Sequence, residues 1–489
     1  MVTKVIIEVL EALFFLLTAL MVAYLVRHYI FTITVLKNAQ KGKTSLSLQN
    51  LAYKPTISIL IPARNEERVI GRLLQRMTEL TYPQDKLQVI VIDDASTDET
   101  GKIAEQYSET YPYIKVFRRG RDKGGRGKAA ALNAGLKHAS GEIVLCFDAD
   151  YYPQRDIVEK LVKEFAEPKV GAVQGRVIVL NEPRNIVTRL VALERIGGYR
   201  VDQEARDKLN LITQFGGTVG GFRRELLESL GGWDENILAE DTDLTLRVYL
   251  AGYKVKYVSD AECYEEAVES WRAYWKQRYR WAKGHMQCAF KHMLNVLKSD
   301  KLRFLEKVDG LLLLNVYFMP IIVLISWIIG TSLLLLKFYQ WLTPFLAVIS
   351  ISLYSAVGNF APFYEVSIGA YLDGRTRTQW LIPLLLFAFL YNIPICTKAF
   401  LDIVLAKLKG KNRHQWDKTV HSGNGNCYIA FLRNNEKVRN DSDSESNLDY
   451  NAVFRDASLH YHYASASNSG AKKTERPGTK NNQRPHGPR

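Results

Sequence analysis

EIVLCFDAD, residues 142–150, shows how the chain is organised, because this apolar run is followed at once by two carboxylates one residue apart. A short apolar run without polar alternation is typical of a strand that is buried on both faces of a sheet. Three similar runs precede it, namely ISILIPAR (57–64), LQVIVIDDAS (87–96) and IKVFRR (114–119). We therefore predict four buried strands in this part of the chain.

The segments between these runs have helical character and extend to about residue 80, from 98 to about 111, and from 128 to 139. Strands that alternate with helices indicate an α/β fold, with a mainly parallel sheet covered on both faces. In such sheets, ligands bind beyond the carboxyl ends of the strands. Five charged side chains fall at these ends: Arg64, Asp93, Asp94, Asp148 and Asp150.

Long apolar segments flank this region and predict an integral membrane protein. Residues 5–26 are too long for the core of a signal peptide, so we expect a retained anchor. Further apolar segments occupy 311–336, 346–360 and 380–406. The last contains Pro383 and Pro394, and it either spans the bilayer or breaks at Pro394 and lies partly in the interface.

The composition narrows the class of partner. The 489 residues carry a formal net charge of +14, and 47% of them are hydrophobic. A basic excess suits nucleic acid, an anionic membrane or phosphate-bearing substrates, but no compact basic-aromatic module of the RNA-binding kind is present. We therefore expect a lipid bilayer and no nucleic acid. The five cysteines are scattered without a CxxC pair, which argues against a disulfide framework or a structural zinc site and favours a reducing cytosol.

Two acidic motifs at strand ends suggest a nucleotide site. Asp93 and Asp94 could accept hydrogen bonds from a base or ribose, although such a turn could also serve only to cap the next helix. Asp148 and Asp150 could hold a divalent cation that binds a diphosphate, and the alternative is a solvated acidic turn. A glycine- and lysine-rich loop, 120–135, contains Lys128 and favours phosphate binding.

Two further motifs follow later in the chain. Glu240 and Asp241 stand at a predicted helix start, where acidic residues are favoured anyway, and Asp241 could instead be a general base. WKQRYRWAKGH (275–285) places Gln277, Arg280 and Trp281 in the spacing QxxRW on one helix face. These side chains suit a diphosphate and a sugar ring, and the alternative is an amphipathic helix anchored at the membrane interface.

The ordered set DD (93–94), DAD (148–150), ED (240–241) and QRYRW (277–281), flanked by membrane spans, resembles the processive family 2 glycosyltransferases. That family includes the cellulose, chitin, hyaluronan and poly-N-acetylglucosamine synthases. Each motif alone is weak, but four in order are specific, and the resemblance covers roughly residues 50–400. It implies a GT-A-type nucleotide-sugar-binding domain with transmembrane helices on both sides, an inverting transfer and a β-linked polymer.

The resemblance also assigns roles to residues. It implies Asp241 and Glu240 as the catalytic pair, Asp148 and Asp150 as ligands of Mg²⁺ or Mn²⁺, and Gly216 and Gly217 with Trp281 as the acceptor contact. Several relatives carry a cysteine-glycine pair where this chain has Gly216 and Gly217. The donor UDP-sugar would be bound by Asp93, Asp94, Lys128, Asp148, Asp150, Gln277, Arg280 and Trp281.

The expected organisation is an N-terminal anchor (1–36), a cytosolic glycosyltransferase domain (52–265), interfacial helices that carry QxxRW (266–305), a C-terminal membrane region (306–408) and a disordered tail (412–489). Lysines after the first span agree with a cytosolic domain. The basic segment 407–418 is also expected on the cytosolic side of the membrane, which requires an even number of C-terminal crossings. We therefore expect a protein that crosses the cell membrane several times.

The expected function is processive transfer of N-acetylglucosamine, as the first candidate sugar, to a growing glycan, with accessory secretion subunits as a further partner that the resemblance allows. One alternative is a non-processive enzyme that acts on a lipid or lipid-phosphate acceptor. A second is a membrane transporter or scaffold without activity, which gives no reason for carboxylates at successive strand ends.

Overall fold

The computed structural model describes residues 2–40, 53–120, 122, 124–336, 361–409, 423 and 429. The span expected at 346–360 lies outside these residues, and so does the tail expected at 412–489 except for two positions. The chain divides into two compact units, Met1–Gly425 and Asn426–Arg489. The helices and strands named here belong to the first unit.

The described strands form one eight-stranded sheet in the order β3-β2-β1-β4-β7-β6-β8-β5. Pairing is parallel for β1 with β2 and β4, for β2 with β3, and for β6 with β8, and it is antiparallel elsewhere. The mainly parallel sheet expected from the sequence is therefore confirmed. The strands are β1 (Ile57–Ala63), β2 (Leu87–Asp93), β3 (Ile114–Arg118), β4 (Ile143–Cys146), β5 (Tyr152–Pro153), β6 (Val170–Val179), β7 (Gly220–Arg223) and β8 (Lys254–Glu265).

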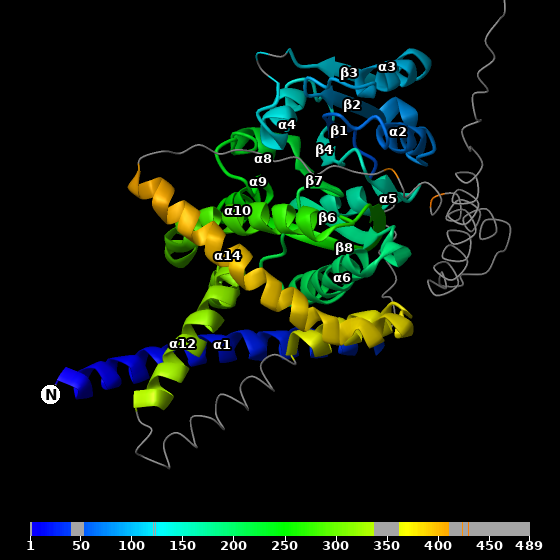
Figure 1. The fold of residues 1–489 in the computed structure, drawn as a ribbon. Coiled ribbons are helices and arrows are strands. Elements are labelled where there is room, and N and C mark those ends of the chain that lie inside the picture. Colours follow the sequence, from blue (N-terminus) through cyan, green and yellow to red (C-terminus); the bar gives the residue numbers. More distant parts are fainter. Residues whose placement is uncertain are drawn as a thin grey trace, which may run out of the picture. The chain divides into compact units, whose positions relative to one another are not determined.

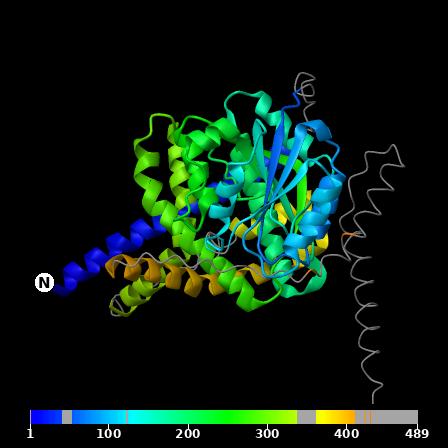
Figure 2. The same ribbon diagram turned by 90° about the horizontal axis from the view of Figure 1, so that it is seen from above.

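Helices cover both faces of the sheet (Figures 1 and 2). Because successive side chains of a strand point to opposite faces, Ile59 of β1 joins the core beneath α2, whereas Leu60 joins the core beneath α4. The helices of the sheet domain are α2 (Ile70–Thr78), α3 (Thr100–Thr110), α4 (Lys128–Leu136), α5 (Ile157–Val162), α6 (Ile186–Arg195), the π-helix η5 (Ile196–Gln203), α7 (Glu204–Lys208), α8 (Arg224–Ser229), α9 (Glu240–Leu250) and α10 (Trp271–Lys298).

Among the described residues, three helices are long and apolar enough to cross a membrane: α1 (Val2–Gln40), α12 (Met319–Leu336) and α14 (Leu385–Leu408). In Figure 1, α12 crosses α1 below the strands as drawn, and α14 runs diagonally across α10. The candidate span within the apolar run 311–336 is Val316–Leu333, which is shorter than the run because α11 (Phe304–Leu314) ends before Asn315 and the 3-10 helix η6 (Val316–Phe318) leads into α12. The alternative of a break at Pro394 is not observed, since α14 continues through this residue.

The anchor helix α1 is joined to the sheet domain by buried ion pairs. Arg27 on α1 lies 2.6 Å from the carboxylate of Asp202 in η5 and 3.1 Å from that of Asp309 in α11. Asp309 also pairs with Arg206 of α7. Removing one member of such a buried cluster is costly because its partner charge stays buried. The helix α1 is therefore a structural part of the sheet domain.

The strand β7 runs between β4 and β6 at the centre of the sheet, and its glycines allow a close approach. A Cβ atom on Gly221 would stand 2.0 Å from the carbonyl oxygen of Val144, and one on Gly220 would stand 2.1 Å from that of Val173. No side chain fits here unless the backbone of a neighbouring strand moves.

We predict that Gly221→Ala destabilises the protein by about 2 kcal/mol or more, because the added methyl group collides with backbone atoms. The apparent melting temperature of the detergent-purified full chain should fall by roughly 4 °C or more. Gly198→Ala is the control, since a Cβ atom there meets nothing within 4 Å. Equal melting temperatures for both variants would contradict the packing described for β7.

Candidate active site

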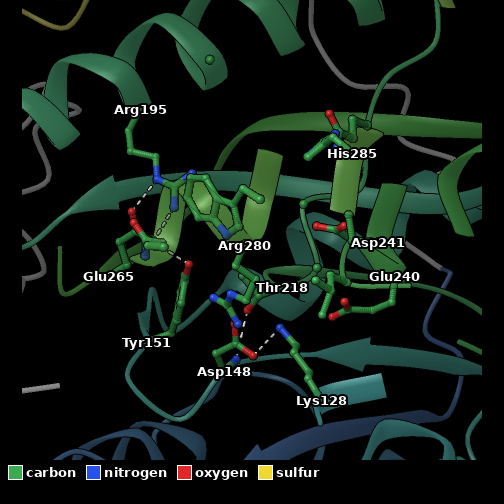
Figure 3. A pocket seen from close by; sticks show the side chains of 18 of the residues that line it. Lys128, Asp148, Tyr151, Arg195, Thr218, Glu240, Asp241, Glu265, Arg280 and His285 are labelled. Carbon is green, nitrogen blue, oxygen red and sulfur yellow. Dashed lines mark hydrogen bonds and ion pairs between the residues drawn. The ribbon is translucent and has the colours of Figure 1, made fainter. Parts of the chain in front are cut away.

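A cavity of about 440 Å³ opens at the carboxyl ends of β1, β2 and β4 and extends to α9, α10, η5 and α1. It brings together all but one of the residues that the sequence suggested. These are Asp94, Lys128, Asp148, Asp150, Gly216, Gly217, Glu240, Asp241, Gln277, Arg280 and Trp281. Figure 3 shows part of its lining. Strand ends, a helix start and the QxxRW helix therefore face one space.

Of the two adjacent carboxylates at the end of β2, only that of Asp94 lines the cavity. Its oxygens lie 2.5 Å from the guanidinium of Arg119 and accept a hydrogen bond of 3.0 Å from the amide of Gly125. Asp93 instead accepts from the amide of Ser96 at 2.9 Å and lies 3.8 Å from Arg118. The geometry assigns Asp93 to the turn and leaves Asp94 as the candidate for nucleoside contact.

Lys128 and Asp148 form an ion pair inside the cavity (Figure 3). Lys128 is the first residue of α4, and its Nζ lies 2.5 Å from Oδ1 of Asp148. Burial lowers the pKa of Lys128, but the carboxylates of Asp148 and Glu240 outweigh this effect and raise the pKa above its usual value. The amide of Asp148 also donates to the hydroxyl of Thr218 at 3.0 Å. A fixed cation thus stands where a diphosphate would be bound.

Asp148 and Asp150 offer a plausible donor set for a divalent cation. Among the described residues there is no group of three or more His, Cys, Asp or Glu side chains arranged to hold a metal. Two carboxylates nevertheless suit a hard cation that takes its remaining ligands from substrate phosphates and water. The residues present therefore fit a metal that binds together with a nucleotide and does not require a preformed protein cage.

Glu240 and Asp241 begin α9, but they do not cap it. The N-cap is Ala239, which has no capping side chain, and Asp241 accepts from the amide of Thr242 at 2.7 Å. Burial, together with the neighbouring charge of Asp241, raises the pKa of Glu240 to about 7. Two carboxylates at the cavity wall, one of which holds its proton more tightly, are a typical arrangement for acid–base chemistry.

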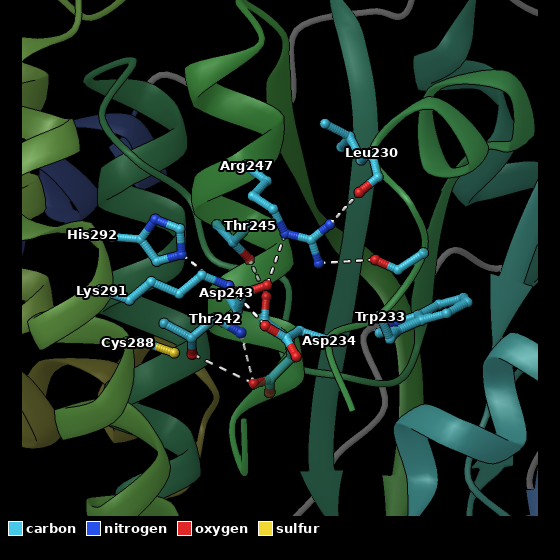
Figure 4. A network of polar contacts seen from close by, with 12 residues as sticks. Leu230, Trp233, Asp234, Thr242, Asp243, Thr245, Arg247, Cys288, Lys291 and His292 are labelled. Carbon is cyan, nitrogen blue, oxygen red and sulfur yellow. Dashed lines mark hydrogen bonds and ion pairs between the residues drawn. The ribbon is translucent and has the colours of Figure 1, made fainter. Parts of the chain in front are cut away.

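A buried network fixes α9 against α10 (Figure 4). The fully buried carboxylate of Asp243 accepts from Arg247 at 2.7 Å, Lys291 at 2.7 Å and His292 at 2.8 Å. Burial alone would raise the pKa of Asp243, but the hydrogen bonds from His292 and Lys291 lower it well below its usual range. Asp243 and Asp241 both lie in the first turn of α9. The network that holds Asp243 therefore also positions Asp241, the candidate base.

Trp281 of the QxxRW motif is contacted by two guanidinium groups. Its ring centroid lies 4.2 Å from the guanidinium carbon of Arg278 and 5.1 Å from that of Arg195. Arg195 is fixed in turn by Glu265 at 2.5 Å, which also accepts from Tyr151 at 2.7 Å (Figure 3). The two cation–π contacts favour one orientation of the indole ring.

The acceptor contact implied by the family falls on a tight glycine turn. The amide of Gly216 donates to the side chain of Gln174 at 2.7 Å. Gly217 has φ +85°, and a Cβ atom there would stand 3.2 Å from the carboxylate of Asp241. The two glycines therefore leave the space next to Asp241 free of side chains.

Several side chains that complete the cavity were not predicted from the sequence. Most of them come from α1, from the end of α6, from η5 and α7, and from β8, which are regions without a recognisable motif. They are Arg27, Tyr151, Arg195, Tyr199, Asp202, Gln203, Arg206 and Glu265. Only the strand end at Asp150 gave a signal for one of them, since Tyr151 follows it directly.

Residues 55–284 match the model of a family described as glycosyltransferase like family 2. This range runs from the start of the sheet to the middle of α10, and it includes the motifs from DD to QxxRW. Residues 55–284, a little under half of the chain, are thus similar to family 2 glycosyltransferases, and helices that could cross a membrane accompany them.

Three curated relatives are similar over this region. The probable glycosyltransferase YdaM of Bacillus subtilis is 37% identical over 57% of this chain and 65% of its own length. The β-monoglucosyldiacylglycerol synthase of Synechocystis is 38% identical over 48% of each chain. The poly-β-1,6-N-acetyl-D-glucosamine synthase of Staphylococcus epidermidis is 30% identical over 50% of this chain and 58% of its own length. The chain thus spans between about half and two thirds of these relatives.

A solved structure supports the same fold. The mannosyltransferase PcManGT from Pyrobaculum calidifontis, solved with GDP-Man and Mn²⁺, is 27% identical and superposes with a TM-score of 0.51. The similarity covers 74% of this chain and 99% of that one. The likeness therefore extends over the whole of that enzyme.

Proposed function

We propose that this chain is an inverting glycosyltransferase that moves a sugar from a UDP-sugar to a growing β-linked glycan at the cytosolic face of the cell membrane. The observation that carries this proposal is the shared cavity. It joins a nucleoside-type carboxylate (Asp94), a DxD motif (Asp148 and Asp150), a carboxylate at a helix start (Asp241) and an aromatic platform (Trp281). A transporter or scaffold gives no reason for this convergence.

The proposed reaction is a single displacement at C1 of the donor sugar. An acceptor hydroxyl lies on the glycine turn, and Asp241 takes its proton while the new C1–O bond forms. The bond between C1 and the diphosphate oxygen breaks at the same time, and UDP leaves on the opposite side, which inverts the anomeric centre. Lys128 and Arg280, both at the cavity wall, stabilise the charge that develops on the diphosphate.

A divalent cation would be held by Asp148 and Asp150, as the chemistry of this pair suggests. When bound, it would offset the charge of the leaving nucleotide. PcManGT was solved with Mn²⁺ and a nucleotide sugar, which supports the same expectation for a chain of similar fold.

A lipid acceptor is the second candidate. Its support is the similarity to the β-monoglucosyldiacylglycerol synthase of Synechocystis, which at 38% identity exceeds the 30% shared with the poly-N-acetylglucosamine synthase. The cavity is also lined by Arg27 of the candidate span α1, so both a membrane-bound glycan and a lipid headgroup could reach it.

Product size should separate the two candidates. The purified full chain, given Mg²⁺ or Mn²⁺ and a panel of UDP-sugars with GDP-mannose for comparison, is expected to release UDP and form a long glycan, with N-acetylglucosamine as the first candidate sugar. A product that carries one sugar on diacylglycerol would replace the polymerase assignment by the lipid one. Absence of nucleotide release from every donor would refute the proposed activity.

We predict that Asp241→Asn lowers the rate of sugar transfer by about 10² to 10⁴-fold, because the amide cannot accept the hydroxyl proton. UDP binding, measured by calorimetry, should stay close to that of the unmodified protein. Asp156→Asn is the control, since this carboxylate is half exposed, pairs with Lys160 and does not line the cavity. Normal turnover in Asp241→Asn would remove this residue from the role of base.

We predict that Asp150→Asn weakens UDP binding in the presence of Mn²⁺ by at least about tenfold, because a metal ligand is lost. With a chelator present, the variant and the unmodified protein should bind UDP equally. If binding by Asp150→Asn retained its full dependence on Mn²⁺, the cation would have to be placed elsewhere.

A further inference from the structure

The π-helix η5 (Ile196–Gln203) forms the wall of the cavity between the glycine turn and the anchor helix α1. Gly198, Tyr199, Asp202 and Gln203 all line the cavity. π-Helical turns are rare in proteins, and those that occur often lie at functional sites. The proposed transfer reaction assigns none of these four residues a role.

Tyr199 points at the place where the acceptor would lie. Its side chain is more than nine-tenths buried, with 8% exposed, and its hydroxyl is 2.8 Å from where a Cβ atom on Gly216 would stand. From the other side, the carboxylate of Asp241 is 3.2 Å from where a Cβ atom on Gly217 would stand. The tyrosine hydroxyl thus borders the space at Gly216, and the candidate base borders the space at the next residue, Gly217.

The hydroxyl of Tyr199 is suited to a neutral partner. Burial raises the pKa of Tyr199 to about 12, so at neutral pH the group keeps its proton and can both donate and accept. Its ring is held by Arg195, whose guanidinium carbon lies 5.8 Å from the ring centroid, and by the ring of Tyr257 at 6.5 Å. A preordered hydroxyl of this kind recognises another hydroxyl without adding charge to the site.

Further along η5, the cavity is lined by the ion pair of Asp202 with Arg27, at 2.6 Å. This pair presents donors and acceptors together, while its two charges largely cancel. Because Arg27 belongs to a candidate membrane span, this end of the cavity faces α1. Neutral molecules with several hydroxyls match such a lining better than a second phosphate would.

We propose that Tyr199, with Asp202 of the same π-helix and Arg27 of α1, forms the acceptor subsite, and that the subsite binds the polyhydroxyl end of the acceptor. Tyr199 orients the attacking hydroxyl toward Asp241. The Asp202–Arg27 pair contacts the other hydroxyl groups at the same end of the acceptor. This inference rests on the proposed function and names the chemical class of the acceptor. The end of a glycan and the glycerol headgroup of a lipid share this chemistry.

The test is Tyr199→Phe in the detergent-purified full chain, with KM measured separately for donor and acceptor. Chitotetraose and dioleoylglycerol micelles serve as the two acceptor probes, and the one whose KM responds identifies the source of the hydroxyls. Loss of one hydrogen bond should raise the acceptor KM about three- to tenfold. The KM for the UDP-sugar should change less than twofold.

Tyr257→Phe is the matched control, because this tyrosine is buried beside Tyr199 and does not line the cavity, and its hydroxyl has no hydrogen-bond partner among the residues that the structure describes. Both of its KM values should equal those of the unmodified protein. An unchanged acceptor KM in Tyr199→Phe, or equal effects in the two variants, would overturn the subsite while leaving the transferase activity in place.

A second variant tests the same geometry from the other side. The methyl group of Gly216→Ala meets the hydroxyl of Tyr199, so this change should also raise the acceptor KM. It should do so less in a chain that already carries Tyr199→Phe, and additive effects would contradict the contact. If the unmodified chain turns over no nucleotide sugar at all, both the proposed function and the subsite fail.

Discussion

Parallel pairing aligns the carboxyl ends of β1, β2 and β4 at one edge of the sheet, and the cavity depends on this alignment. Ala63 pairs with Asp93, so β1 and β2 end at the same level, whereas β4 ends earlier, where Cys146 pairs with Leu60. The antiparallel neighbour β7 follows directly after the turn that holds Gly216 and Gly217. Side chains from segments more than 100 residues apart thus face one space without a long loop.

Several carboxylates that line this space are paired with cations. Asp94 lies against Arg119, Asp148 against Lys128, and Glu265 against Arg195, and each pair combines a carboxylate with a cation at about hydrogen-bond distance. Buried ion pairs of this kind contribute little net stability compared with apolar packing. They do hold side chains in fixed positions, and a polar, preordered environment is what a reaction with a charged leaving group requires.

The sequence predicted the buried strands and most of the cavity because both follow from local patterns. Apolar runs of six or seven residues define the strands, and the acidic residues that follow them are placed by the sheet. It could not distinguish Asp93 from Asp94, because adjacent side chains point in opposite directions and only the turn determines which one faces the cavity.

Tyr199 and Arg27 were not predicted from the sequence, since they reach the site only through tertiary packing of segments that carry no motif. The span expected at 311–336 is found, but it begins only at Val316, because the apolar character of the run does not reveal the end of α11 before Asn315.

The ion pairs between α1 and the sheet domain have a practical consequence for anyone who wishes to isolate that domain. Cutting the chain after α1 would remove Arg27 from its ion pairs with Asp202 and Asp309. Arg206 would then be left with these two carboxylates, and one negative charge would lose its cation. The same cut would open one wall of the cavity to water. Preparations that keep the first forty residues, in detergent or in a lipid nanodisc, therefore offer the sounder route to biochemical work on this protein.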